Sequence, residues 1–145
     1  LLHLRPTELE NKTLQEGLQM ILKELTDKSN IRVVYKDMVK KVPKRIEDNL
    51  FRIAQEFISN TLKHAKASQI EVYLYQNSQE IQLKMLDNGV GFDLNASTDE
   101  MSYGLKNIQE RVDEMAGTVQ FLSAKGKGTS IDVRVPILRG EDNVE

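Results

Sequence analysis

The sequence contains no cysteine and no tryptophan, and only three of its 145 residues are proline. Without cysteine, a disulfide-stabilised scaffold and a thiolate zinc site are both excluded. No apolar run approaches the ~18 residues that a membrane-spanning helix needs, and the first residues show no signal-peptide pattern. With 39% hydrophobic and 29% charged residues, the composition is typical of a soluble globular protein. The length suits a single domain over residues 1–145, and since the first residue is not Met we expect the chain to be cut from a longer protein.

Neither sign of charge dominates, since the formal net charge is −2 at pH 7. A general affinity for nucleic acid or for an anionic membrane is therefore not expected. The basic residues are nevertheless unevenly spread, because eight of them lie between Lys36 and Lys66 against four acidic residues. This excess is typical either of a local anion site or of a solvated helix face, and both interpretations stay open.

The first predicted helix opens with a capping box, for which the chain offers two candidates. Thr7 with Glu10 forms one, and Thr13 with Glu16 forms the other. The apolar residues that follow have helical spacing, and they are Leu14, Leu18, Ile21, Leu22 and Leu25. A short strand comes next, with alternating residues Ile31, Val33 and Tyr35.

The second helix is expected to begin just after Pro43, because proline is tolerated at the first helical position, and to continue to about Lys66. Its apolar stripe consists of Ile46, Leu50, Ile53, Ala54, Phe57 and Thr61. A hairpin with one buried face follows, and its inward residues are Ile70, Val72, Leu74, Ile81, Leu83 and Met85.

The last third of the chain begins with a polar stretch without period over residues 92–103. A third helix is expected from Gly104, with Gly117 as its C-terminal stop. A final hairpin pairs residues 118–124 with 129–136, and residues 139–145 are expected to form a disordered tail. Together the elements predict an α+β fold, in which about three helices pack on one face of a mixed, mostly antiparallel five-stranded sheet.

Four polar residues share one side of the second helix, and they are Glu56, Asn60, Lys63 and His64. At about 100° per residue they span an arc of roughly 100° on the rim of the apolar stripe, so they are expected to line the edge of a cleft. An amide oxygen can ligate Mg²⁺, a lysine can neutralise a phosphate, and a carboxylate can orient a water or accept a proton. A capping or surface role remains open for each, and packing is the simpler interpretation of His64.

The segment Asp87-Asn88-Gly89-Val90-Gly91 follows directly on the second strand of the first hairpin. Gly89 and Gly91 permit positive φ and let a ligand approach the main chain closely. Asp87 can accept a hydrogen bond from an exocyclic amine, which would select adenine over guanine. The alternative is a plain turn that uses its glycines for geometry alone.

Two further segments have the composition of ligand-binding loops. Gly104 is expected to open the third helix, and its first free amides, around Leu105 and Lys106, could bind phosphate oxygens with the help of the helix dipole. The polar stretch before them has the length of a mobile lid. Gly126, Gly128 and Thr129 lie in a turn that could approach a purine or could serve only the hairpin. Neither a P-loop nor a Rossmann glycine motif occurs.

These elements occur in one order along the chain, namely Glu56-x-x-x-Asn60, Lys63-His64-Ala65, Asp87-x-Gly89-x-Gly91, Gly104-Leu105 and Gly126-Lys127-Gly128-Thr129. In this order they resemble the ATP-binding catalytic domain of sensor histidine kinases, within the superfamily of the DNA gyrase, heat-shock 90 and MutL ATPases. The start of the chain, Leu2-His3-Leu4-Arg5-Pro6, looks like the junction after the dimerisation helices in the subfamily that works with NarL-type response regulators. Three segments resemble Gram-positive sensors of cell-envelope stress, of the LiaS and VraS kind, and they are Leu2-His3-Leu4-Arg5-Pro6, Ile46-Glu47-Asp48 and Ser102-Tyr103-Gly104-Leu105-Lys106-Asn107.

The resemblance implies the layered α/β sandwich called the Bergerat fold, with ATP held between the helices and a lid. It implies that Asn60 ligates a Mg²⁺ ion on the phosphates, with Glu56 beside the metal and with Lys63 and His64 facing the phosphates. Asp87 would bind the adenine amine. The other nucleotide-binding residues would be Gly89, Gly91, Gly104, Leu105, Gly126, Gly128 and Thr129.

The resemblance also implies an enzyme, a protein-histidine kinase that passes the γ-phosphate of ATP to a histidine of a separate dimerisation domain and on to a response regulator. The helix that bears this histidine is absent, and residues 1–6 would be a remnant of the junction to it. The domain would be cytoplasmic and monomeric, without nucleic acid or direct membrane contact, and its parent a homodimer in the cell membrane. Two alternatives stay open: a conformational ATPase of the same superfamily, and a non-catalytic nucleotide-sensing module.

Overall fold

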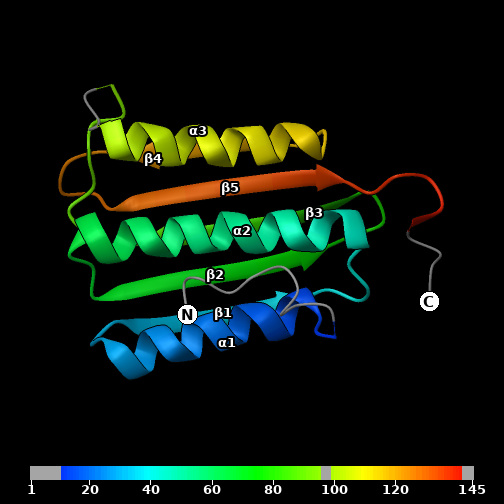
Figure 1. Ribbon diagram of the computed structural model, residues 1–145, viewed down its shortest axis with the longest axis horizontal. Helices are drawn as coiled ribbons and strands as arrows, with labels where there is room; N and C mark the ends of the chain where they lie inside the picture. The colour runs from blue at the N-terminus through cyan, green and yellow to red at the C-terminus, as the bar shows by residue number, and fades with distance from the viewer. Residues whose placement is uncertain (1–10, 96–98, 142–145) are drawn as a thin grey trace.

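Three helices lie side by side on one face of a five-stranded sheet in the computed structural model, which describes residues 11–95 and 99–141 (Figure 1). The helices are α1 (Leu14–Lys28), α2 (Lys44–Asn60) and α3 (Asp99–Glu114), and the π-helical turn η2 (Thr61–Ala65) continues α2. The strands are β1 (Arg32–Met38), β2 (Gln69–Gln76), β3 (Glu80–Asp87), β4 (Thr118–Ser123) and β5 (Thr129–Pro136). The junction expected at residues 1–6 lies outside the described residues.

The strands are arranged in the order β1-β2-β3-β5-β4. The pair β1 and β2 is parallel, whereas the other three pairs are antiparallel. Figure 1 shows α1 in front of β1, α2 in front of the middle strands and α3 in front of β4. The predicted α+β fold, with its helices on one face of a mixed and mostly antiparallel sheet, is therefore confirmed.

The core lies between the helices and the facing side of the sheet. Alternate apolar residues of β2, β3 and β5 are fully buried between the sheet and the helices, and these residues are Ile70, Val72, Leu74, Ile81, Leu83, Met85, Ile131, Val133 and Val135. The apolar stripes predicted for α1 and α2 are buried against them. Since full burial of one aliphatic side chain contributes about 1.5–3 kcal/mol, this layer is the main source of stability.

Helix α1 begins with the second of the two candidate capping boxes. The Thr13 side chain accepts a hydrogen bond from the amide of Glu16 at 3.1 Å, and Glu16 accepts one from the amide of Thr13 at 2.8 Å. Glu47 in the first turn of α2 accepts a further bond from the amide of Leu14 at 2.9 Å. Burial raises the pKa of the Glu47 carboxyl, and the Leu14 bond opposes this effect. The start of α1 is thereby attached to the start of α2.

The second helix ends differently from the prediction. It was expected to continue as one helix to about Lys66, but the α-helix ends at Asn60 and the last turn is wound as η2. Lys66 then reverses the chain with a left-handed φ of 51°. A π-helical turn is wider than an α-helical one, so it redirects the last carbonyl groups of the helix, often at functional sites.

The third helix begins at Asp99, five residues before the predicted start at Gly104. The polar residues before Gly104 obscured the helical period, but Met101 is buried and extends the stripe of Ile108, Val112 and Met115 by two turns. The polar stretch expected over residues 92–103 is therefore not without helical structure throughout, because residues 99–103 are helical. The amides of Leu105 and Lys106 lie in the interior of α3, so the prediction that they are free at a helix start is wrong.

The C-terminal stop of α3 is also displaced by one residue from the prediction. Ala116, rather than Gly117, takes the left-handed conformation, with φ of 57°. The amide of Gly117 bonds the carbonyl of Val112 at 3.0 Å, and the amide of Ala116 bonds that of Asp113 at 3.0 Å, which is the Schellman pattern. Gly117 is required for another reason, because a Cβ there would lie 2.6 Å from the carbonyl oxygen of Arg134.

Replacing Ala116 with glycine is expected to stabilise the domain by about 0.5–1 kcal/mol, because a left-handed conformation costs an L-residue about 1–2 kcal/mol and costs glycine little. Part of the gain is offset by the greater freedom of glycine in the unfolded chain. Urea unfolding measures the change. Ala67→Gly is the matched control, since Ala67 is not among the described residues with positive φ, and it should destabilise. A loss of stability in Ala116→Gly would contradict the assignment of the cap.

Arg45 of α2 connects several segments at the far end of the sheet. Its guanidinium donates to the carbonyls of Pro136 and Met115 and to the carboxylate of Glu141. Burial raises the pKa of Glu141, but the bonds from Arg45 and from the Leu138 amide outweigh burial and lower it overall. The disordered tail expected from residue 139 is therefore wrong for 139–141, while residues 142–145 lie outside the described part of the chain.

Candidate functional site

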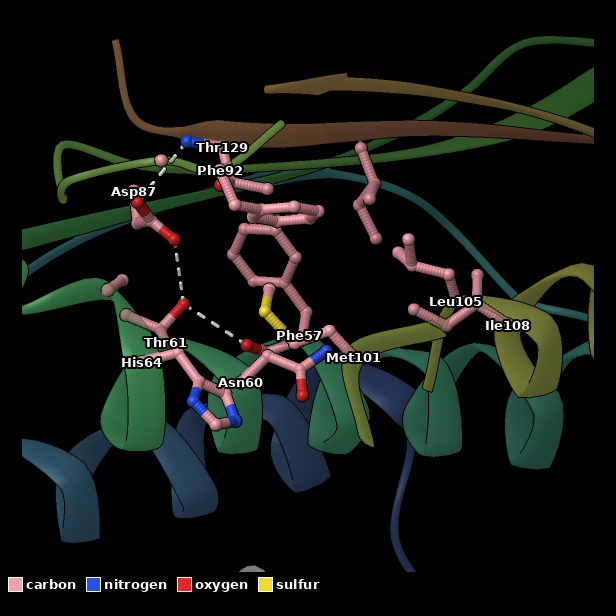
Figure 2. Close-up of a pocket in the computed structure, with 13 residues that line it drawn as sticks. Phe57, Asn60, Thr61, His64, Asp87, Phe92, Met101, Leu105, Ile108 and Thr129 are labelled. Carbon is pink, nitrogen blue, oxygen red and sulfur yellow. Dashed lines mark hydrogen bonds between the residues drawn. The ribbon is translucent and has the colours of Figure 1, made fainter. Parts of the chain in front are cut away.

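A cavity opens between α2, η2, α3 and the ends of β3 and β5 (Figure 2). Figure 2 shows Phe57, Phe92 and Met101 at its centre, Asp87 at one end, and Leu105 and Ile108 at the other. Its other lining residues are Asn60, Thr61, His64, Ala65, Gly91, Thr129 and Ile131. Six of the predicted site residues thus meet in one place, and they are Asn60, His64, Asp87, Gly91, Leu105 and Thr129.

Asp87 is buried at the end of β3, and protein donors hold both of its oxygens. Oδ1 accepts from the amides of Gly89 at 2.9 Å and Thr129 at 3.3 Å, while the Thr61 hydroxyl lies 2.9 Å from Oδ2. A buried carboxylate is costly unless such bonds compensate for lost hydration. The bonds fix the orientation of an acceptor-only group at the end of an otherwise apolar cavity.

The loop after Asp87 is attached to the π-helical turn. The amide of Val90 donates to the carbonyl of Ala65 at 2.6 Å, and a Cβ on Gly89 would lie 2.2 Å from the same oxygen. Asn88 accepts two bonds at 2.9 Å from the amides that precede and begin β2. The glycine at position 89 is therefore required by the approach of η2, which agrees with the geometric interpretation that the sequence left open beside the approach of a ligand.

Gly91 and Gly128 also lie against backbone carbonyl groups that leave no room for a Cβ. Gly91, with φ of 65°, would place a Cβ 2.1 Å from the carbonyl of Ala124, and Gly128, with φ of 73°, would place one 2.2 Å from the carbonyl of Asp87. Gly126 also has positive φ, but a Cβ there would meet nothing within 4 Å. Of the two interpretations left open for Gly126 and Gly128, a role in the hairpin fits the geometry, because neither lines the cavity and Gly128 packs on Asp87.

Replacing Gly128 with alanine is expected to lower the free energy of unfolding by about 3 kcal/mol or more, because the new methyl group forces the β5 start away from Asp87. Gly126→Ala is the matched control, since it has the same backbone strain without the collision and should cost only about 1 kcal/mol. Urea unfolding of both variants gives the comparison. Equal losses would show that the backbone contact at Gly128 does not constrain the Asp87 loop.

Asn60 and Glu56 converge where α3 crosses α2. A Cβ on Gly104 would lie 3.0 Å from Oε2 of Glu56 and 3.2 Å from Nδ2 of Asn60, so both side-chain ends lie against this glycine. Asn60 lines the cavity, whereas Glu56 faces a polar groove on the other side of this crossing. The two residues therefore join the apolar cavity to the polar groove.

The polar groove has a volume of about 550 Å³ and lies between α2 and α3. Its charged residues are of both signs, namely Arg52, Glu56, Lys63, Glu110, Arg111 and Glu114. Lys63 is exposed and lines this groove, while His64 lines the cavity with its ring turned away from the aromatic centre (Figure 2). The polar arc predicted on α2 is thus divided between two adjacent hollows.

Helix α3 closes the cavity with side chains that sequence analysis did not select. Met101 and Ile108 line it with Leu105, and the enclosed volume is about 70 Å³. Typical pockets for small ligands measure about 300–1,000 Å³, so a bound ligand must displace some of these side chains. Leu105 contributes its side chain instead of the predicted free amide. Thr61 was also missed, because it fell in the apolar stripe of α2, and only its contact with Asp87 reveals its role.

The cavity and its loops lie within a segment that matches a known protein family. The family described as histidine kinase-, DNA gyrase B- and HSP90-like ATPase matches residues 45–139. The chain belongs to this family. As a member of this ATPase family it is an ATP-binding domain, and the matched segment includes every residue of the cavity and of the polar groove.

Known sensor kinases are similar to this ATPase domain over nearly its whole length. The sensor protein VraS of Staphylococcus haemolyticus is 43% identical over 143 residues, which are 99% of this chain and 41% of the relative. The sensor histidine kinase LiaS of Bacillus subtilis is 43% identical over 141 residues, which are 97% of this chain and 39% of the relative. The resemblance to such sensors is confirmed, and the chain spans about two fifths of their length.

Solved structures support the fold of the ATPase domain. The histidine kinase domain of the Erythrobacter litoralis blue-light activated kinase EL346 has a TM-score of 0.69 at 17% identity, covering 91% of this chain and 64% of that one. The mycobacterial sensor histidine kinase MprB has a TM-score of 0.63 at 17% identity, covering 86% of this chain and 95% of that one.

In the described part of the chain, no helix is both long and apolar enough to cross a bilayer.

Proposed function

We propose that this ATPase domain is the catalytic domain of a two-component sensor histidine kinase. The observation that carries the proposal is the buried carboxylate of Asp87 at the end of an apolar cavity, with Asn60 lining the same cavity where it meets a polar groove. A flat apolar base suits the cavity, and a charged phosphate chain suits the groove. The similarity to VraS and LiaS supports the assignment to sensor kinases.

The adenine ring would occupy the cavity, with its exocyclic amine donating to Asp87. This carboxylate can only accept, so it favours a ring with an amine at that position over one with a carbonyl oxygen. Phe57 and Phe92 would contact the faces of the base. Gly91 and Thr129 would complete the wall, while Gly89 and Gly128 would keep the loops around Asp87 in place.

The phosphates would lie along α2 toward the polar groove. The Asn60 carboxamide and the Glu56 carboxylate both lie against Gly104, and their oxygens are of the kind that Mg²⁺ prefers. No group of three or more acidic, histidine or cysteine residues suited to a metal exists among the residues described, so most ligands of the ion would be phosphate and water oxygens. Lys63 and His64 would face the phosphates, and the Lys63 ammonium would neutralise part of their charge.

The proposed reaction is the transfer of the γ-phosphoryl group to histidine. A nitrogen of an acceptor imidazole forms a bond to the γ-phosphorus while the bond from that phosphorus to the bridging oxygen breaks, and ADP leaves. The acceptor belongs to the dimerisation domain, so this domain contributes positioning and charge neutralisation. A magnesium ion, when bound, would withdraw charge from the phosphate oxygens.

Partners and location follow from the same proposal. The dimerisation domain of the same kinase supplies the histidine, and a NarL-type response regulator receives the phosphoryl group on an aspartate. The parent is proposed to be a homodimer in the cell membrane, with this domain on the cytoplasmic side. The domain itself is proposed to be monomeric, with no binding of nucleic acid and no direct membrane contact.

Phosphoryl transfer to an added acceptor tests the proposal. The chain is mixed with a separately made histidine-bearing dimerisation domain and with ATP labelled at the γ-phosphate, and the label is expected on the acceptor in an acid-labile, base-stable form. Release of labelled phosphate to water with no transfer would instead support a conformational ATPase. Absence of ATP binding would support a non-catalytic module.

A further inference from the structure

Thr61 occupies an unusual position at the junction of α2 and η2. Its side chain is buried, with only 2% of the residue exposed, and its hydroxyl oxygen lies 2.9 Å from Oδ2 of Asp87 and 3.1 Å from the carbonyl of Phe57. Figure 2 shows the hydroxyl between these two acceptors. A hydroxyl has a single proton, so it can donate to only one of them at a time.

The carboxylate of Asp87 is the favoured acceptor. The carbonyl of Phe57 already accepts the backbone amide of Thr61, so it does not require the hydroxyl proton. A hydrogen bond to an ionised oxygen is also roughly twice as strong as one between neutral groups. The geometry therefore directs the Thr61 proton toward Oδ2.

Three of the lone-pair positions of Asp87 are then filled by the protein. Oδ1 accepts two backbone amides, from Gly89 and Thr129, and Oδ2 accepts the Thr61 hydroxyl. A carboxylate has about four such positions, so about one remains for a ligand. The two backbone amides hold one oxygen, and only a side chain holds the other.

We infer that Thr61 is a positioning residue that sets the orientation of Asp87 and thereby the preference of the domain for a purine with a 6-amino group. This inference rests on the proposed binding of adenine by Asp87. Thr61 does not touch the base in this role. It fixes Oδ2 as an acceptor with one free position, which matches a single N–H of the exocyclic amine and offers nothing to a 6-oxo group.

The test compares two nucleotides in the wild-type chain and in two variants. Thr61→Val removes the hydroxyl but keeps the shape and the branching at Cβ, and Thr61→Ser keeps the hydroxyl. Calorimetry measures the affinity of each for ATP and for purine riboside triphosphate, which lacks the 6-amino group. The wild-type chain should prefer ATP. In Thr61→Val the ATP affinity should fall about tenfold while that for purine riboside triphosphate stays the same, and Thr61→Ser should restore the preference.

Thr26→Val is the matched control for a loss of helical packing. The Thr26 hydroxyl bonds the carbonyl four residues earlier in α1 at 3.0 Å, as Thr61 does in α2, but it is remote from Asp87. This variant should leave both affinities unchanged. If Thr61→Val does not fold, as judged by thermal unfolding, Thr61→Ala provides the same comparison.

Two outcomes separate the inference from the proposed function. If the wild-type chain binds both nucleotides equally well, Asp87 does not recognise the 6-amino group of adenine, and the proposed pocket is wrong. If the wild-type chain prefers ATP but Thr61→Val keeps the whole preference, or loses affinity equally for both nucleotides, the inference about Thr61 is overturned while the pocket stands.

Discussion

Replacing Asp87 with asparagine is expected to lower the affinity of the domain for ATP by about 100-fold or more without unfolding it. The carbonyl of the new side chain can keep the bonds from the amides of Gly89 and Thr129. Its amino group then faces Thr61, whose hydroxyl can turn toward the carbonyl of Phe57. The fold is therefore satisfied, but a donor now meets the amine of adenine. Calorimetry with ATP measures the loss.

Asp132→Asn is the control for the change of charge. Asp132 lies on β5 outside the cavity and accepts a bond from Gln82 at 3.0 Å. The Asp132→Asn variant removes the same charge from the chain as Asp87→Asn and should leave ATP binding unchanged. An undiminished affinity for ATP in Asp87→Asn would refute the placement of adenine at this carboxylate.

Replacing Asn60 with alanine is expected to separate nucleotide binding from magnesium dependence. The adenine cavity loses only one polar lining residue, so part of the ATP affinity should remain. The amide oxygen proposed to ligate the ion is lost, so chelation of Mg²⁺ should no longer change the ATP affinity, and phosphoryl transfer to an added acceptor domain should fall about 100-fold or more. Calorimetry with and without EDTA and a labelled-ATP transfer assay measure the two effects.

Asn49→Ala is the matched control on the same helix. Asn49 is half-buried on α2, and its side chain accepts a bond from Arg111 at 3.1 Å, but it does not line the cavity. The Asn49→Ala variant should leave both the magnesium dependence of ATP binding and the phosphoryl transfer intact. Retained transfer in Asn60→Ala would contradict the role of this amide.

Periodicity predicted most of the fold because the helices and the sheet each bury one side. The stripe from Ile46 to Thr61 and the alternation from Ile70 to Met85 depend on local spacing alone, and both are buried as expected. The first turn of α3 was missed because Met101 is its single buried apolar residue. Its helical state depends on packing over the cavity, which is a tertiary contact that no local pattern contains.

The sequence predicted which residues form the site more fully than it predicted their contacts. Asp87 and Asn60 were selected from their types and spacing, and the structure brings both to one cavity. The role of Gly89 and Gly128 was different, since the atoms that approach them are carbonyl oxygens of η2 and β3. A glycine in the sequence indicates that a position has no room for a Cβ, but it does not identify the neighbouring atom that fills the space.

The closure of the cavity by α3 has a consequence for the kinetics of nucleotide uptake. Met101 and Leu105 occupy space that a purine needs, and both belong to the first two turns of that helix. Entry of a purine therefore requires these two side chains to move, and we expect this movement rather than diffusion to limit the rate of association. A domain of this kind reaches a plateau in its observed association rate as the nucleotide concentration rises.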